Sequence, residues 1–278
     1  MIFKSKNTYL NFVDGVGFLQ FPTLLELNFI NHAFSTRIGG VSEGEYKSMN
    51  LNFKRGDDPE KVTENYKIFC NAAGFDFNSL VSSSQDHNTF VRNVTKADCG
   101  IGITRPHDIE SVDALITNEP GVTLVTHYAD CTPLLFADPE KKVIALAHAG
   151  WRGTIGKIGE AVVQQMHDDY GCDLTDIIAV VGPAIGTCCY EVDTPVFEEF
   201  ASLTELKPAY FTKSLGHGKY LINLKETNRR MLMDAGLLSI NITISDVCTK
   251  CNSGLLFSHR ASGGKRGGLI AMMCINEQ

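Results

Sequence analysis

The sequence lacks any apolar run long enough to cross a bilayer. Asn, Asp, Glu, His or Lys interrupts every hydrophobic stretch short of the roughly 20 residues that a membrane helix needs. Residues 1–7 show neither the apolar region nor the small-residue cleavage site of a secretory leader. We therefore expect no membrane role.

Positive charge is also scarce, with 25 Lys and Arg against 32 Asp and Glu and a formal net charge of -7. Neutralising the phosphates of a nucleic acid needs clustered Lys and Arg, so we expect no nucleic-acid partner. The short charged stretches at residues 57–61 and at Lys265-Arg266 are interpreted as solvated surface or loop. The sequence contains no Gly-x-x-x-x-Gly-Lys-Ser/Thr loop and no Rossmann glycine fingerprint, so neither ATP nor NAD is implied.

The nine cysteines form an odd number in a chain without a recognisable leader. This is typical of a protein kept in a reducing cytoplasm. Cys248-x-x-Cys251 is a metal or redox candidate, but it lacks a second pair at zinc-finger spacing. We interpret these two residues as unpaired thiols, and the vicinal Cys188-Cys189 as structural.

The composition, with 44% hydrophobic and 21% charged residues and no Pro/Ser/Gly-rich linker, predicts one domain over residues 1–278. A β-rich first third followed by alternating strand and helix patterns predicts the α/β class, with a mixed central sheet flanked by helices. The expected strands are residues 27–34, 79–84, 122–125, 143–147, 176–181, 241–247 and 269–275, and the expected helices are residues 59–73, 154–170 and 223–235.

Two of the expected strands lead to side chains that bind metals or act as nucleophiles. His148 directly follows residues 143–147, and Cys131 follows residues 122–125 within Ala129-Asp130-Cys131-Thr132-Pro133. Strands that end in such residues are typical of a site presented at one edge of a sheet. The sequence therefore indicates an enzyme.

These residues belong to seven motifs that occur in a fixed order. The motifs are Phe34-Ser35-Thr36-Arg37-Ile38-Gly39-Gly40, Met49-Asn50-Leu51, Asp113-Ala114-Leu115-Ile116-Thr117, Ala129-Asp130-Cys131-Thr132-Pro133, His148-Ala149-Gly150-Trp151-Arg152-Gly153, Gly182-Pro183-Ala184-Ile185-Gly186 with Tyr190-Glu191-Val192, and Phe257-Ser258-His259-Arg260. Together they resemble the purine nucleoside phosphorylase family, also labelled polyphenol oxidoreductase or laccase domain. The resemblance covers most of the chain and implies a single α/β domain with a zinc site of two histidines and one cysteine.

The resemblance also implies purine nucleosides and phosphate as substrates. The implied reactions are phosphorolysis of adenosine, inosine, guanosine and methylthioadenosine, together with deamination of adenosine. Carried over by motif, the zinc ligands fall on His87, Cys131 and His148. Gln85-Asp86-His87-Asn88 departs from the usual Gln-Val-His-Gly but retains the ligand, and Ala261 replaces the second of two arginines, so that any phosphate contact from that position is lost.

The chemistry of these side chains agrees with a zinc site. Two imidazoles and one thiolate suit tetrahedral zinc, and three protein ligands leave a position for water or substrate. Taken singly, a histidine after a strand or a cysteine such as Cys131 is more often a packing residue. Because these residues converge with Gly-rich and Asp-containing loops, the residues alone support a metal site and a packing role equally. The resemblance then favours the metal site.

Copper fits less well than zinc. A blue-copper centre also uses two histidines and one cysteine, but usually adds a weak axial methionine. Multicopper oxidases also need His-x-His pairs, and none of the eight histidines forms one. We therefore expect Zn²⁺, and keep a copper polyphenol oxidase as an alternative.

Phosphate and ribose need polar partners, and the motif loops supply candidates. Arg37, Arg152 and Arg260 carry guanidinium groups whose paired donors suit phosphate oxygens. Arg37 and Arg260 are the stronger candidates. Arg152 is ambiguous, because a charged residue that opens a helix after His148 is equally well explained as solvated. Ser35 and Ser258 are candidates for hydrogen bonds to phosphate or ribose.

The mechanistic hypothesis is that zinc polarises the substrate or activates water for deamination, whereas phosphate attacks C1′ in phosphorolysis. Asp130 is a candidate acid/base or supporting residue, although an Asp beside a strand end is equally often a cap or turn former. Two alternatives stay open. Cys131 and His148 would be the nucleophile and base of a cysteine hydrolase, or the site would be a metal-binding module that acts through partners without catalysis.

Overall fold

The computed structural model describes residues 4–108 and 110–277. Its strands form two six-stranded sheets and one three-stranded sheet. The first sheet has the order β1-β2-β3-β15-β7-β4 and is mixed, since only β4 and β7 pair in parallel. Its strands are β1 (Tyr9–Val13), β2 (Val16–Gln20), β3 (Ile30–Ser35), β4 (Leu80–Ser82), β7 (Thr123–Tyr128) and β15 (Leu269–Ile275).

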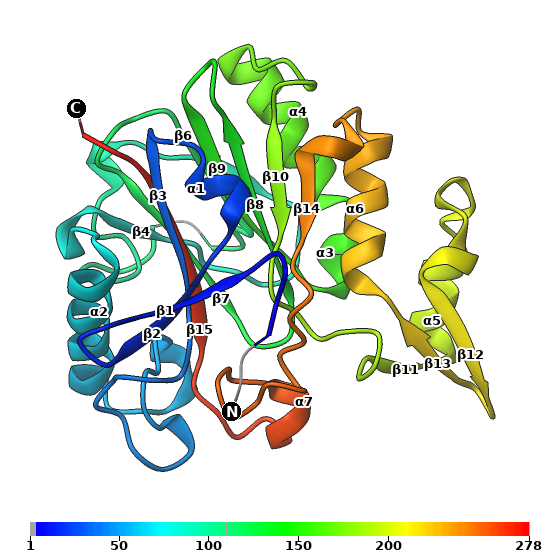
Figure 1. The fold of residues 1–278 in the computed structure, drawn as a ribbon, viewed down its shortest axis with the longest axis horizontal. Coiled ribbons are helices and arrows are strands. Elements are labelled where there is room, and N and C mark those ends of the chain that lie inside the picture. The colour runs from blue at the N-terminus through cyan, green and yellow to red at the C-terminus, as the bar shows by residue number, and fades with distance from the viewer. Residues whose placement is uncertain (1–3, 109, 278) are drawn as a thin grey trace.

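The second sheet has the order β14-β10-β8-β9-β6-β5, with parallel pairs at both ends and antiparallel pairs between them. Its strands are β5 (Val91–Asn93), β6 (Ala114–Thr117), β8 (Thr132–Asp138), β9 (Val143–Ala149), β10 (Ile178–Val181) and β14 (Ile242–Ile244). The small sheet, at the right in Figure 1, contains β11 (Glu191–Asp193), β12 (Thr212–Gly216) and β13 (Lys219–Ile222).

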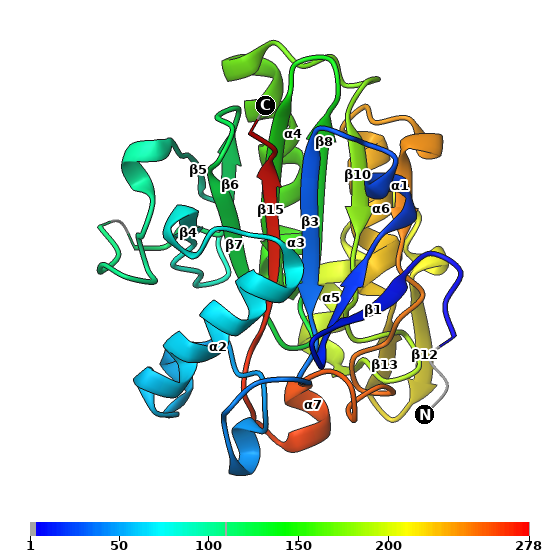
Figure 2. The ribbon, with the colours of Figure 1, turned by 60° about the vertical axis from the view of Figure 1, so that its left-hand side comes forward.

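The two large sheets pack face to face, and their inner faces share one apolar core. Leu124 and Met273 of the first sheet belong to the same buried cluster as Leu135 and Leu146 of the second. The outer face of the first sheet is covered by α2 (Pro59–Ala73), and that of the second by α4 (Ile158–Tyr170) and α6 (Leu224–Asp234) (Figures 1 and 2). The predicted single α/β domain with flanking helices is confirmed, and its mixed sheet is divided into two packed sheets.

The helix predicted at residues 59–73 is confirmed, and local signals explain both of its ends. The side chain of Asp58 accepts a hydrogen bond from the backbone N–H of Glu60, and Pro59 occupies the first turn. Tyr66 and Phe69 face the core with no exposure. Gly74 ends the helix in the left-handed conformation at φ 75°, which glycine adopts without steric cost.

The single helix predicted at residues 154–170 is wrong. The chain instead forms α3 (Trp151–Ile155) and α4, separated by a break at which Lys157 adopts a left-handed φ of 64°. The N–H groups of Gly156 and Lys157 bond back to Arg152 and Thr154 and close α3 early. The other helices are α1 (Pro22–Leu25), α5 (Thr194–Ala201) and α7 (His259–Ser262).

Other boundaries shift by a few residues, and the structure adds strands that the sequence pattern did not indicate. The most consequential is β8, which begins directly after Cys131 and contains Pro133. Proline is rarely a strand-interior residue, which is why the pattern did not suggest it. Within the described residues, no helix has both the length and the apolar character that crossing a membrane requires.

Candidate metal centre and adjoining pocket

The candidate ligands lie where the two large sheets meet. His87 is in the loop that follows β4 of the first sheet, and His148 is on β9 of the second. Cys131 lies in the short link from β7 to β8, where the chain passes from the first sheet to the second. Cys131 directly precedes β8, whose Thr132 pairs with Ala149 of β9, so Cys131 and His148 lie at the same end of the second sheet, as the sequence predicts.

The structure brings these three residues, named here the His/Cys cluster, to one point. One potential ligand atom from each of His87, Cys131 and His148 lies within 4.8 Å of the others. A Cβ atom at Gly150 would stand 2.5 Å from His87 Nδ1 and 3.2 Å from Cys131 Sγ. Glycine at position 150 therefore gives the cluster the space that any side chain would occupy.

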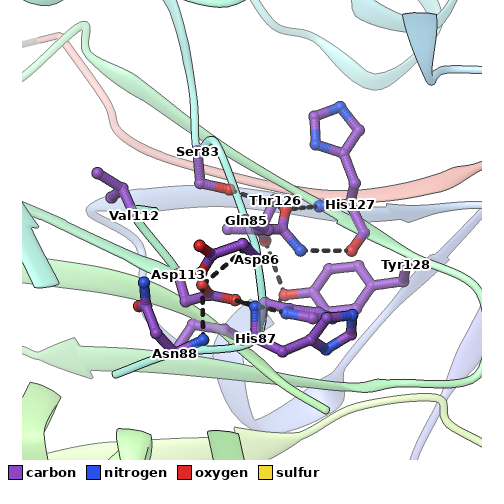
Figure 3. A network of polar contacts seen from close by, with 12 residues as sticks. Ser83, Gln85, Asp86, His87, Asn88, Val112, Asp113, Thr126, His127 and Tyr128 are labelled. Atoms are coloured by element: carbon purple, nitrogen blue, oxygen red, sulfur yellow. Dashed lines mark hydrogen bonds and ion pairs between the residues drawn. The ribbon is translucent and has the colours of Figure 1, made fainter. Parts of the chain in front are cut away.

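Asp113 contacts two members of the His/Cys cluster, His87 and His148. Its buried carboxylate lies 2.8 Å from His148 Nδ1 and accepts hydrogen bonds from the backbone N–H groups of Asp86, His87 and Asn88 at 3.0, 3.2 and 3.1 Å. Figure 3 shows this loop folded around Asp113. The contact to Nδ1 leaves Nε2 of His148 as the atom available to a metal, the arrangement in which a carboxylate orients a ligating imidazole.

Electrostatics couples the members of this group. Burial lowers the pKa of His148, but Cys131 and Asp113 outweigh it and raise that pKa to about 9. Burial would raise the pKa of Asp113, yet its hydrogen bond with His148 holds the pKa below the usual value. Burial and the proximity of His148 lower the pKa of His87. His148 and Asp113 therefore stabilise opposite charges on one another, whereas the lowered pKa of His87 favours its neutral form.

Two non-glycine residues beside the cluster adopt left-handed backbone conformations. His87 has φ 74° and Asp130 has φ 90°, and such conformations cost of order 1–3 kcal/mol unless neighbouring contacts hold them. The carboxylate of Asp130 accepts hydrogen bonds from Thr249 Oγ1 at 2.5 Å and from the backbone N–H of Arg260 at 2.7 Å. Both of its oxygens thus fix the link that carries Cys131 against two later loops.

A pocket opens directly beside the His/Cys cluster and is lined by cations. Lys54 and Arg55 reach it from the 3-10 helix Phe53–Arg55, and Arg266 reaches it from the loop before β15. No Asp or Glu is among its lining residues in the described part of the chain. We call this the cationic pocket; its charge suits an anionic ligand.

Arg266 is the buried cation of the cationic pocket. Its side chain donates from Nη1 to the carbonyl of Gly267 at 2.9 Å, whereas its buried Nε has no hydrogen-bond partner. Burial, and then the neighbouring Arg55, lowers the pKa of Arg266 to about 10. The interpretation of Lys265-Arg266 as solvated is therefore wrong for Arg266, which is 7% exposed, and right for Lys265.

Two of the arginines expected to bind substrate, Arg152 and Arg260, are not among the described lining residues of the cationic pocket. Both Arg152 and Arg260 are exposed, and both interact electrostatically with the phenol of Tyr190, as does Cys131. The guanidinium of Arg152 also lies 4.1 Å from the centre of the Trp151 ring. That of Arg260 donates to the carbonyl of Glu191 at 2.9 Å.

The other predicted substrate residues are engaged by the protein itself. Arg37 donates to the carbonyls of Lys47 and Ser253 at 2.9 and 3.1 Å. Ser258 caps α7, and the buried Ser35 accepts the backbone N–H of Ile270 at 2.8 Å. Arg37 and Ser258 line a separate hollow, which meets the cationic pocket at Arg266.

The structure also revises the interpretation of four cysteines. Cys248 and Cys251 are not isolated thiols, because Cys188 and Cys189 supply the second pair. The four Sγ atoms all lie within 4.8 Å of one another. We name these residues the four-cysteine cluster.

Sequence reasoning gave no role to Asp113 and placed Arg266 on the surface. Asp113 opens one of the seven motifs and directly precedes the buried β6, a signal that would have marked it as a candidate. Arg266 offered no comparable signal, since its burial depends on packing between distant loops.

Fold and site together define an α/β protein with a metal-competent His/Cys cluster beside an anion-attracting pocket. Residues 31–276 match the family model described as multi-copper polyphenol oxidoreductase laccase. The chain belongs to this family.

Relatives of known name support the same assignment. A protein of Bacillus subtilis named purine nucleoside phosphorylase YlmD is 36% identical over 245 residues, covering 88% of each chain. A protein from an unknown prokaryotic organism, named an adenosine deaminase, is 33% identical over 243 residues, covering 84% of this chain and 90% of that one. The crystal structure of YlmD from Geobacillus stearothermophilus superposes with a TM-score of 0.89 at 32% identity, covering 98% of this chain and 100% of that chain.

Replacing Asp113 with Asn should weaken metal binding by about 10–100-fold, the usual effect of losing a carboxylate that orients a metal-binding histidine. The amide NH₂ would face backbone N–H groups that now donate to a carboxylate oxygen. Metal titration against a chelator measures the effect. Asp14→Asn is the matched control, because Asp14 lies in the exposed β1–β2 turn. Equal affinities in the two variants would contradict the role given to Asp113.

Proposed function

We propose that this chain is a zinc-dependent purine nucleoside phosphorylase that also deaminates adenosine. Its substrates would be phosphate and adenosine, inosine, guanosine or methylthioadenosine. The observation that carries the proposal is the His/Cys cluster, with its ligand atoms within 4.8 Å of one another, at the wall of the cationic pocket. The printed names of the relatives, which include a purine nucleoside phosphorylase and an adenosine deaminase, agree with it.

The donor set fits zinc. Two imidazoles and one thiolate are ligands that zinc accepts tetrahedrally, and three protein ligands leave one position open. Asp113 supports the imidazole of His148, as expected around a metal. Copper is less well supported, because the described lining of the pocket includes no methionine and the sequence has no His-x-His pair.

Zinc bound here would supply a Lewis acid and lower the pKa of a water molecule towards neutrality. The protein contributes the positions of the ligands. The contact of His148 Nδ1 with Asp113 sets the direction of the ring, and the N–H bonds to the same carboxylate hold His87 in its left-handed conformation.

Phosphate binding is assigned to the cationic pocket. The unpartnered Nε of Arg266 offers a donor, and Lys54 and Arg55 add positive charge from the 3-10 helix Phe53–Arg55. In phosphorolysis an oxygen of phosphate forms a bond to C1′, the bond from C1′ to the purine nitrogen breaks, and the proton that phosphate loses ends on the purine. Cations that hold phosphate in place favour this reaction through proximity and charge stabilisation.

The residues predicted from the sequence divide into contact and support roles. Arg152 and Arg260, whose charges interact with the phenol of Tyr190 as Cys131 does, are proposed to contact the substrate on the Cys131 side. Asp130 is proposed as a positioning residue, because both carboxylate oxygens already accept hydrogen bonds. Arg37 holds two loops together by donating hydrogen bonds to their carbonyls. Ser35 accepts a backbone N–H of β15, and Ser258 accepts a backbone N–H of α7, so both serines also support the protein itself.

A second candidate function rests on the order Cys131, His148, Asp113. A thiol nucleophile, an imidazole base and a carboxylate that orients the imidazole are the parts of a cysteine hydrolase. That candidate gives no role to His87, whereas a metal enzyme requires it. The dependence of activity on His87 therefore separates the two functions.

Adenosine incubated with zinc-loaded protein should yield adenine only when phosphate is present, and inosine in either case. His87→Asn should lower both activities by about 100-fold or more, because metal chemistry contributes several kcal/mol to catalysis. Asn tolerates the left-handed backbone at this position. Product chromatography measures both reactions.

The matched control is His217→Asn, since His217 is exposed, also has a positive φ of 51° and lies on the distant β12–β13 hairpin. Full activity in His87→Asn would reject the metal mechanism, and retained deamination without phosphorolysis would favour the cysteine hydrolase. Adenosine left intact by the unaltered protein under both conditions would reject the proposed function.

Replacing Arg266 with Met keeps the apolar stem and removes the charge. A hydrogen bond to a charged group contributes about 1.5–3 kcal/mol, so we expect the KM for phosphate to rise by about 10–100-fold. Deamination measured without phosphate should change far less. Lys265→Met is the neighbouring control, because Lys265 is exposed. An unchanged KM for phosphate would place the phosphate site elsewhere.

A further inference from the structure

We propose that the four-cysteine cluster is a second metal site, in which Cys188, Cys189, Cys248 and Cys251 bind a single structural Zn²⁺. The site is separate from the His/Cys cluster and shares no ligand with it. Four protein ligands would close the coordination shell, which is the mark of a structural rather than a catalytic zinc.

The spacing of the sulfur atoms fits one tetrahedral ion. The Sγ atoms of Cys188 and Cys189 each lie 3.5 Å from that of Cys251, and all four Sγ atoms lie within 4.8 Å of one another. A Zn–S bond of about 2.3 Å in a regular tetrahedron puts the sulfurs about 3.8 Å apart. The site therefore needs only small side-chain adjustments to accept the ion.

The same spacing argues against the other uses of grouped cysteines. An iron–sulfur cluster attaches its thiolates to different iron atoms, whereas these thiols converge on one point. A disulfide would use two of the four sulfurs, and Cys251 is equally close to Cys188 and Cys189. A tetrathiolate site uses all four.

Backbone geometry around Cys248 is that of a metal-binding turn. The N–H of Gly186 donates to Cys248 Sγ at 3.2 Å, which stabilises negative charge on the sulfur. The backbone N–H and side-chain amide of Asn252 bond to the carbonyl of Cys248 at 3.1 and 2.8 Å and close the turn that brings Cys251 round. The C-x-x-C spacing is a common half of a zinc site.

A buried cation balances the charge of the thiolates. Lys225 is 7% exposed, lines the same surface hollow as Cys188 and Cys248, and interacts electrostatically with both. Its ammonium donates to the carbonyls of Ser245 and Val247, the residues that lead into the C-x-x-C turn. A zinc bound by four thiolates is an anion overall, so a nearby ammonium lowers the cost of forming it.

The site joins two loops that reach the His/Cys cluster. Thr249, between two of the cysteines, donates to Asp130, and the N–H of Ile185 donates to the Asp130 carbonyl. Two residues after Cys189, the carbonyl of Glu191 accepts a hydrogen bond from Arg260. We infer that zinc at the four-cysteine cluster stiffens the side of the active site formed by these loops.

Zinc analysis of the full-length protein, purified under reducing conditions without chelator, tests the proposal. We expect two zinc ions per chain in the unaltered protein and in the control Cys99→Ser, because Cys99 belongs to neither cluster. Cys251→Ser and Cys131→Ser should each retain one ion, and the double variant none. Cys251→His should keep two, since imidazole also binds zinc.

X-ray absorption of Cys131→Ser provides a readout that leaves the four-cysteine cluster intact. The remaining zinc should show four sulfur neighbours at about 2.3 Å. Unchanged zinc content in Cys251→Ser, iron in place of zinc, or a disulfide among these cysteines in the intact mass of protein purified without reductant would overturn the proposal. Loss of zinc in Cys251→Ser but not in Cys131→Ser would support this site and reject the proposed catalytic one, so the two failures are distinguishable.

Discussion

The buried carboxylate of Asp113 is the contact on which the geometry of the site depends. It precedes β6 of the second sheet and gathers three backbone N–H groups from the loop after β4 of the first. It also holds His148 on β9. An ionised carboxylate is costly to bury without partners, and this set of donors offsets that cost. The contact that joins the ends of the two sheets therefore also positions two of the three candidate ligands.

Two regions of opposite electrostatic character adjoin this contact. The His/Cys cluster and Asp113 form a region suited to a cation, whereas Arg266 and its neighbours form an adjoining region suited to an anion. The link that carries Cys131 passes between the two sheets and is fixed by Asp130 to later loops. These loops run on to the four-cysteine cluster. The proposed reaction of a nucleoside with phosphate beside a metal would use these two adjacent but distinct regions.

Local signals made parts of the fold predictable. The helix at residues 59–73 has its own cap, proline and terminal glycine, and the strand at residues 269–275 is a continuous apolar run, so both emerge as predicted. The division into two sheets was not accessible, because β8 contains a proline and begins without a turn signal after Cys131. The candidate ligands were predicted through motif resemblance together with their chemistry. The spatial partners of these residues were not predicted, because the interactions of Asp113, Arg266 and the cysteine pairs join segments that are remote in sequence. Cys188 and Cys251, for example, are 63 residues apart.

Anomalous diffraction at the zinc edge, from crystals of the unaltered protein, tests the central claim most directly. The account predicts a peak within bonding distance of His87, Cys131 and His148, with His148 Nε2 towards the metal and Nδ1 still in contact with Asp113. A zinc-loaded crystal with no peak at these residues, or with His148 turned away from Asp113, would contradict it.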